Sequence, residues 1–146
     1  MASVFDVARF ILEAKGRMST MKLQKLCYYC QAWSLVWDDK ELFPEEFEAW
    51  ANGPVCKELF AVTKGKFDVV ASDEPGDSKS LTDDQIDTIN AVLDHYGDRN
   101  AQWLSELTHL EDPWKFARKR AGAIDGISCS EIVTKEDMAI YYGGLA

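Results

Sequence analysis

The sequence lacks any long hydrophobic run. No apolar stretch approaches the roughly 20 residues that a bilayer-spanning helix needs, and the N-terminal segment MASVFDVARF lacks the pattern of a secretory signal. We therefore expect a cytoplasmic protein that does not interact with membranes. In that compartment its four cysteines are expected to be reduced thiols.

Positive charge is also scarce. Lys and Arg number 16 against 25 Asp and Glu, which gives a formal net charge of −9. Proteins that grip phosphate backbones depend on Lys and Arg, so nucleic acid is not expected as a direct partner. The acids are concentrated in the segments 38–50 and 68–87, whereas residues 15–25 and 115–120 are basic. Such polarity can orient a charged partner protein.

The residues of enzyme active sites are few. The chain has two histidines, no Gly-rich phosphate loop and no GxSxG nucleophile elbow. The one CxxC pair, Cys27 and Cys30, falls in the middle of an apolar helical stripe, where a metal knuckle or redox site would not be placed, and is expected to pack as small hydrophobes. We expect neither a metal nor a cofactor, and no enzymatic activity.

Helical patterns dominate what is present. The length of 146 residues fits one domain, 1–146. Capping residues followed by apolar positions at helical spacing predict helices that begin after Ser3, Ser19 or Thr20, Thr82, Asn100, Asp112 and Thr134, with a further helix from Val55 to Thr63. Alternation of apolar and polar residues predicts a strand at 47–51 that ends in a turn at 52–54. A second short strand is predicted at 67–70, within a long exposed loop, 64–80. The prediction is a mainly α protein, a single compact domain of six or seven helices with a small β element.

The helix expected from residue 20 to about Trp37 is apolar on nearly every side, which is typical of a central helix. Trp33 and Trp37 continue its core stripe, and Gln24 and Gln31 are expected to need hydrogen-bond partners in the interior. Together with the preceding helix and the turn at Gly16 it has the outline of a helix-turn-helix. A DNA-binding regulator is therefore one alternative function, although a recognition helix needs a polar face.

Three sequence blocks resemble the Panacea domain family, the SocA-like or phage-associated antitoxins. Residues 21–33, MKLQKLCYYCQAW, are similar to the family's KLQKLLYYAQGW core. Residues 47–55, FEAWANGPV, resemble IEAWxxGPVV, and residues 104–118, LSELTHLEDPWKFAR, resemble LSxLTHxExPWxxAR. The resemblance implies an antitoxin that neutralises a cognate toxin by direct protein contact. The acidic balance suggests that this toxin has a basic surface.

Polar and aromatic residues of these blocks gather at turns and helix starts, where a rigid scaffold presents binding residues. We expect a surface or near-surface toxin-binding patch formed by Trp50, Asn52, Gly53, Thr108, His109, Trp114 and Arg118. Beneath it, Lys22, Gln24 and Lys25 are expected to pair with Glu48 or Glu111. A second alternative is a proteolytic adaptor that delivers the toxin to a AAA+ protease, because the chain ends in the small apolar pair Leu145-Ala146.

Overall fold

A computed structural model describes residues 2–146. They form seven α-helices: α1 (Val4–Lys15), α2 (Thr20–Trp37), α3 (Lys57–Thr63), α4 (Asp83–Tyr96), α5 (Ala101–Leu110), α6 (Asp112–Ala121) and α7 (Lys135–Gly143). The strands in this part of the chain are β1 (Met18–Ser19), β2 (Phe47–Trp50), β3 (Gly53–Val55), β4 (Asp68–Val69) and β5 (Ile132–Val133). One hydrophobic core draws residues from α1 through α7, so the prediction of a single, mainly α domain with a small β element is confirmed.

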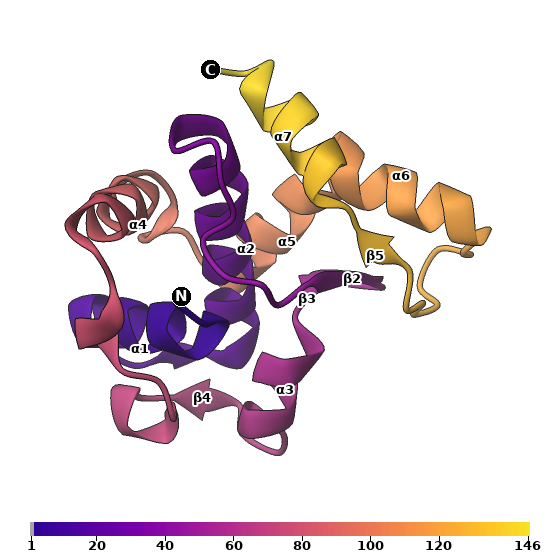
Figure 1. The fold of residues 1–146 in the computed structure, drawn as a ribbon. Coiled ribbons are helices and arrows are strands. Elements are labelled where there is room, and N and C mark those ends of the chain that lie inside the picture. Colours follow the sequence, from indigo (N-terminus) through magenta and orange to yellow (C-terminus); the bar gives the residue numbers. More distant parts are fainter. Residues whose placement is uncertain (1) are drawn as a thin grey trace.

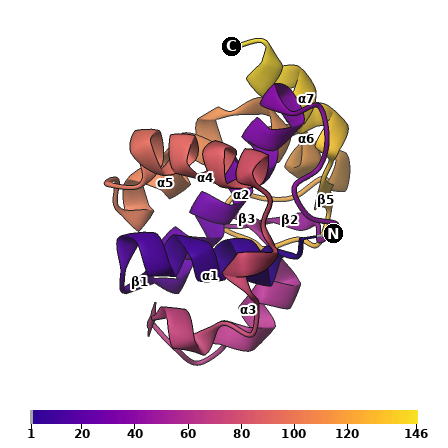
Figure 2. The same ribbon diagram turned by 60° about the vertical axis from the view of Figure 1, so that its left-hand side comes forward.

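Helix α2 runs through the centre of the molecule, and α1, α4, α5, α7 and the β2–β3 strands pack around it (Figures 1 and 2). Every residue from 23 to 32 is buried. Gln31 meets the expected need for interior partners: its Nε2 donates to Phe43 O at 2.7 Å, and its Oε1 accepts from Leu42 N at 2.7 Å. A helix covered on all sides has no face free to enter a DNA groove, so this helix pair lacks a recognition helix.

The apolar stripe of α2 extends beyond the core at the C-terminal end of the helix. Trp33 is half-buried, and Trp37 is 49% exposed and stacks on Trp33 with ring centroids 4.9 Å apart. The prediction that Trp37 belongs to the core is therefore wrong. Helical spacing gave the correct side of the helix, but the core ends a turn earlier. Among the described residues, no helix is both long and apolar enough to cross a membrane.

Local capping explains where most helices begin. Ser3 and Thr82 form capping boxes with Asp6 and Gln85, and the side chains of Ser19, Asn100 and Thr134 each accept a hydrogen bond from the first turn of their helix. These positions agree with the prediction. At α6 the expected cap, Asp112, is instead the first helical residue, and Glu111 holds the cap position without a side-chain bond. Glu111 cannot cap because its carboxylate lies in the interior, bound to two tyrosines.

Two small antiparallel sheets complete the fold. In one, β2 pairs with both β3 and β5, in the order β3-β2-β5; in the other, β1 pairs with β4. The strands at 47–50 and 68–69 were predicted. The segment expected to be only a turn and a helix start is in fact strand β3, and α3 begins at Lys57. Pro54 is compatible with β3 because this is an edge strand, where a missing N–H is tolerated.

The segment 64–80 is not the open loop that its composition suggests. It folds over α1 in two short 3₁₀ turns, η1 (Ala71–Asp73) and η2 (Ser78–Ser80). Asp6 Oδ1 accepts a hydrogen bond from Asp77 N at 2.7 Å, and any side chain at Gly76 would meet the backbone of Phe5. Glu74 is thereby buried, and within the described chain neither of its carboxylate oxygens has a hydrogen-bond partner.

Burial raises the pKa of Glu74 to about 7, and the charge of Asp73 adds to the effect. Between the ordinary glutamate pKa of about 4.5 and pH 7, the folded state therefore keeps a proton that the unfolded state releases. We expect the Glu74 contribution to stability to fall as pH rises through that window and to level off above it. Glu74→Gln should remove this contribution, as measured by denaturant midpoints from pH 4 to 8.

The matched control for Glu74→Gln is Glu136→Gln, which changes an exposed carboxylate on α7. Its pH profile should run parallel to that of the unaltered protein. Parallel profiles for all three proteins would show that Glu74 is not held in its uncharged form in the fold.

Candidate functional site

The three sequence blocks that resemble Panacea-family motifs meet at the β2–β3 hairpin. Trp50 pairs with Gly53 across a turn formed by Ala51 and Asn52. An isolated hairpin of this length would be only marginally stable in water. Here, helices on three sides hold its backbone through their side chains.

Helix α2 holds the second strand of the hairpin and the residue after it. Gln24 Oε1 accepts from Cys56 N at 2.8 Å, and Gln24 Nε2 donates to Cys56 O at 3.0 Å. Lys25 Nζ donates to Pro54 O at 3.1 Å. The expectation that Gln24 needs an interior partner is confirmed, but the partners are backbone groups and not Glu48 or Glu111.

Helices α5 and α6 hold the first strand and the turn. Ser105 Oγ donates to Asn52 O, Trp114 Nε1 donates to Trp50 O at 2.9 Å, and Arg118 Nη1 donates to Ala49 O at 2.9 Å. The carbonyls of residues 49, 50, 52, 54 and 56 thus all accept a hydrogen bond from a side chain on a helix. Buried carbonyls left without such donors would be costly, so the hairpin has little freedom to change shape.

The residues predicted to form one surface patch divide into two groups. Gly53, Thr108 and Arg118 are buried, so their placement on the surface is corrected. Arg118 is 5% exposed, and its Nη2 also donates to the carbonyls of Ile124 and Ile127 at 2.9 and 2.6 Å. Arg118 was expected in the patch because polar and aromatic residues of the three blocks gather at turns and helix starts. Its planar group of donors instead binds a set of converging carbonyls.

The other patch residues do reach the surface. Asn52 is exposed, and Trp50, His109 and Trp114 are half-buried. His109 stacks on Trp114 with ring centroids 4.1 Å apart, and the Arg118 guanidinium lies 5.1 Å from the centre of the Trp114 ring. Trp114 is thus part of the support for the hairpin as well as of its outer surface.

The supporting polar network is also different from the prediction. Glu48 accepts from Trp50 Nε1 at 2.9 Å and lies 3.9 Å from Lys57 Nζ. Lys22 is half-buried at the start of α2 and pairs with neither predicted glutamate. Glu111 accepts from the hydroxyls of Tyr29 and Tyr142 at 2.7 and 2.8 Å. Burial raises the pKa of Glu111, and those hydroxyls oppose the rise.

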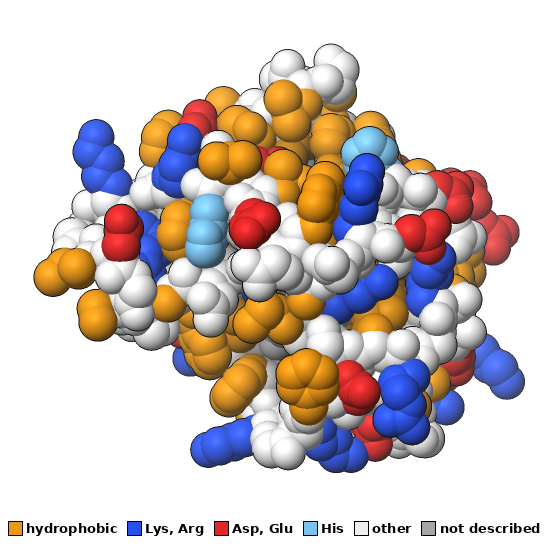
Figure 3. All heavy atoms as spheres, turned by 180° about the vertical axis from the view of Figure 1, so that it is seen from behind, with side chains coloured by type: hydrophobic (Ala, Val, Ile, Leu, Met, Phe, Trp, Pro, Cys, Tyr) orange, Lys and Arg blue, Asp and Glu red, His pale blue; other side chains and the backbone are white. Residues whose placement is uncertain are grey.

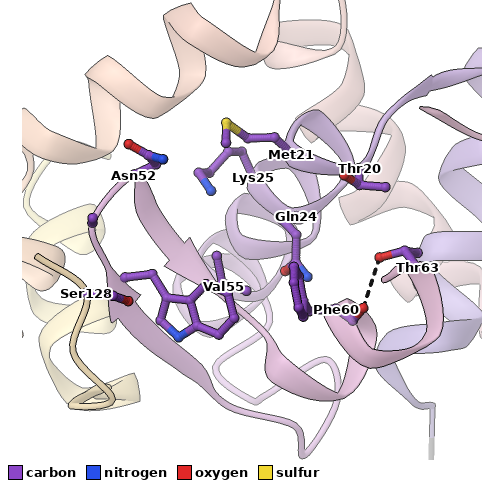
Figure 4. A pocket seen from close by; sticks show the side chains of 11 residues that line it. Thr20, Met21, Gln24, Lys25, Asn52, Val55, Phe60, Thr63 and Ser128 are labelled. Atoms are coloured by element: carbon purple, nitrogen blue, oxygen red, sulfur yellow. Dashed lines mark hydrogen bonds between the residues drawn. The ribbon is translucent and has the colours of Figure 1, made fainter. Parts of the chain in front are cut away.

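A groove of about 340 Å³ lies between the hairpin, the start of α2 and helix α3; we call it the hairpin groove (Figure 4). Its lining consists of Thr20, Met21, Gln24, Lys25, Trp50, Ala51, Asn52, Val55, Phe60, Thr63 and Ser128. Four of the predicted residues therefore share it: Gln24, Lys25, Trp50 and Asn52. Sequence reasoning missed Met21 and Phe60, although Met21 belongs to the first block and Phe60 is apolar next to the core residue Leu59.

The electrostatics of this region are set by burial. Lys25 is fully buried, and burial lowers its pKa to about 7. Burial also lowers the pKa of His109, and the charges of Lys25 and Arg118 lower it further. The three thiols in the core, those of Cys27, Cys30 and Cys56, have pKa values raised by burial. Within residues 2–146, no group of three His, Cys, Asp or Glu side chains is arranged to hold a metal ion.

Gly53 is essential to this arrangement because its backbone has a φ of +118° and a Cβ there would lie 2.7 Å from Lys25 Cε and 2.8 Å from Thr108 Oγ1. Gly53→Ala should lower the free energy of unfolding by about 1–3 kcal/mol through backbone strain and by about 1–3 kcal/mol more through overpacking. The measurement is chemical denaturation. Gly16→Ala is the matched control, since Gly16 also has a positive φ, +82°, but open space around it. Equal losses for the two variants would contradict the close packing at Gly53.

Comparison with known proteins identifies the family of this chain. A family model described as "Antitoxin SocA-like, Panacea domain" matches residues 23–115, from α2 into α6, and so includes the hairpin and most of the side chains that hold it. No curated protein and no solved structure matches the chain. The match covers well over half of the sequence and agrees with the resemblance of the three blocks. The chain belongs to the SocA-like antitoxin family that carries the Panacea domain.

Proposed function

We propose that this chain acts in the cytoplasm as a binding protein, not an enzyme, and neutralises a cognate toxin by direct contact at the hairpin groove. The observation that supports this most strongly is the fixation of one short hairpin by side chains from α2, α5 and α6, all within the segments typical of the family. A surface that is already rigid loses little conformational entropy when a partner binds.

The rim of the groove has the composition of a protein-binding surface. Met21 and Phe60 are 37% and 39% exposed, and the half-buried Trp50 meets Phe60 edge to face with ring centroids 5.0 Å apart. Aromatic residues and methionine are enriched in the centres of protein interfaces. Of the predicted patch, we retain Trp50, Asn52, His109 and Trp114 as the candidates for toxin contact.

A second groove supplies the charge that the acidic composition led us to expect. It has a volume of about 340 Å³ and is lined by Pro44, Glu45, Glu46, Glu48, Lys57, Glu58 and Ile132. Four glutamates against one lysine make it acidic, and it shares β2 and α3 with the hairpin groove. A toxin with a basic surface would place apolar side chains in the hairpin groove and basic ones beside these glutamates.

Exposed apolar side chains are not confined to the groove. On the face opposite to that of Figure 1, hydrophobic side chains form a broken band among charges of both signs (Figure 3). Trp103 on α5 is also 37% exposed, and its ring lies under Arg99 at 4.4 Å. It lies outside the lining of the hairpin groove and provides a tryptophan control.

Trp50→Ala and Phe60→Ala should each weaken toxin binding at least about tenfold, a loss of about 1.4 kcal/mol, because each removes an aromatic contact at the rim. Trp103→Ala should stay within about twofold of the unaltered protein. The toxin is the product of the neighbouring reading frame, and binding is measured by titration calorimetry, with rescue of growth on co-expression as the cellular readout. Unchanged affinity in both rim variants, with folding intact, would contradict the proposed contact site.

Toxin half-life in the same cells separates simple occlusion from the proteolytic adaptor alternative. Neutralisation by contact predicts a half-life that is unchanged or longer when this protein is present. A half-life that shortens with this protein and recovers when the AAA+ protease is removed would favour the adaptor.

A further inference from the structure

We propose that the floor of the hairpin groove is a binding site for a carboxylate attached to an apolar body, with Lys25 as the group that recognises the charge. The inference concerns a ligand of this chain alone and does not rest on the proposed toxin neutralisation.

Lys25 is a buried amine without an acidic partner. The side chain is fully buried, and its amino group has three N–H donors, of which one is used by Pro54 O at 3.1 Å. No ion pair in residues 2–146 includes Lys25, and burial is the one cause of its lowered pKa. A buried ammonium is normally paired, because burial of an uncompensated charge is strongly unfavourable. Here the missing partner is an anion.

The groove leads to this amino group. Lys25 lines it and is its one ionisable side chain, and Figure 4 shows the amino nitrogen directed toward the hairpin beside Asn52. The exposed Met21 and Asn52 flank it at the surface. An unbranched methionine side chain can move aside at little cost, which would give a ligand access to the floor.

The side chains that line the hairpin groove determine which apolar group the ligand carries. Trp50, Val55 and Phe60 offer aromatic and aliphatic surface, and a volume of about 340 Å³ falls within the range of small-molecule sites. One buried ammonium matches a single negative charge. A phosphate dianion would bring a second charge into an apolar groove, whereas a carboxylate with a phenyl or branched aliphatic group satisfies both the charge and the walls.

Proton uptake should accompany binding. With a pKa of about 7, Lys25 is largely neutral above that pH, whereas a bound carboxylate favours its charged form. The one ionisable side chain of the hairpin is Glu48, which accepts from Trp50 Nε1 at 2.9 Å and lies 3.9 Å from Lys57 Nζ. On α5, the titratable group that interacts with Lys25 is His109, whose own pKa is lowered. On α2, the titratable neighbours one turn away include Lys22 and Tyr29. The Tyr29 hydroxyl donates to Glu111. The change between pH 6.5 and 8.5 is therefore assigned to Lys25.

The test uses 3-phenylpropionate and, as its uncharged match, 3-phenylpropionamide, added to the full chain and followed by backbone amide NMR. The acid should give saturable shifts at Asn52, Val55 and Phe60 and the amide should not. Because Lys25 must be protonated to hold the anion, affinity should fall about 20–30-fold from pH 6.5 to pH 8.5. Calorimetry in two buffers of different ionisation enthalpy should show proton uptake at the higher pH.

Variants and peptides complete the design. Lys25→Met removes a buried charge but also the donor to Pro54 O, so its fold is checked first by denaturation. In the folded variant the shifts caused by the acid should be abolished, whereas Lys22→Met, one turn away and outside the lining, should retain them. The peptide acetyl-Ala-Ala-Phe with a free or an amidated C-terminus separates the two sources of such a carboxylate. Tighter binding of the free-ended peptide than of the small acid indicates a polypeptide terminus, and the reverse indicates a free organic acid.

Equal shifts from acid and amide, binding that survives Lys25→Met, or no saturable shift from the acid or the free-ended peptide would overturn the proposal. Should Lys25→Met fail to fold, the acid–amide pair and the pH series on the unaltered protein still decide it.

Discussion

The structure depends on one constraint: a central helix that is buried on every side but carries polar side chains. Gln24, Lys25 and Gln31 of α2 lie among core residues, and each must find a hydrogen-bond partner within the protein. All three find backbone groups in the segment from Leu42 to Cys56. The path of that segment, and with it the position of the hairpin, is therefore fixed by the same residues that satisfy the core.

Side chains from α5 and α6 extend the same principle to the other strand of the hairpin. Ser105, Trp114 and Arg118 donate to carbonyls of β2 and the turn, so that a structure of two short strands has the rigidity of the helices around it. This explains how motifs as far apart in the sequence as residues 21–33 and 104–118 form one unit. A binding surface built in this way keeps its shape without a large sheet to support it, and the exposed side chains of its rim remain free for a partner.

Much of the fold could be predicted because its signals are local. Serine, threonine and asparagine caps with helical spacing placed five helix starts, those of α1, α2, α4, α5 and α7. The apolar surroundings of Gln24 and Gln31 indicated that both needed interior partners. The partners themselves could not be predicted, because backbone carbonyls leave no mark in a sequence. Charge suggested that Lys25 would meet Glu48 or Glu111, whereas it binds Pro54 O, and Arg118 is buried among carbonyls instead of lying on the surface. Strand β3 was missed for the same reason, since its formation depends on Lys25 and Gln24 holding it from another part of the chain.

The central claim is that this rigid hairpin and its groove form the surface at which the chain meets its toxin. This proposal is tested by a map of backbone amide shifts in the labelled protein on addition of the proposed toxin partner. We expect the largest changes at Met21, Asn52, Glu58 and Phe60, around the two grooves that share β2 and α3. Changes confined to α4 and to the exposed Trp37, which lines a separate groove with α4, would contradict it.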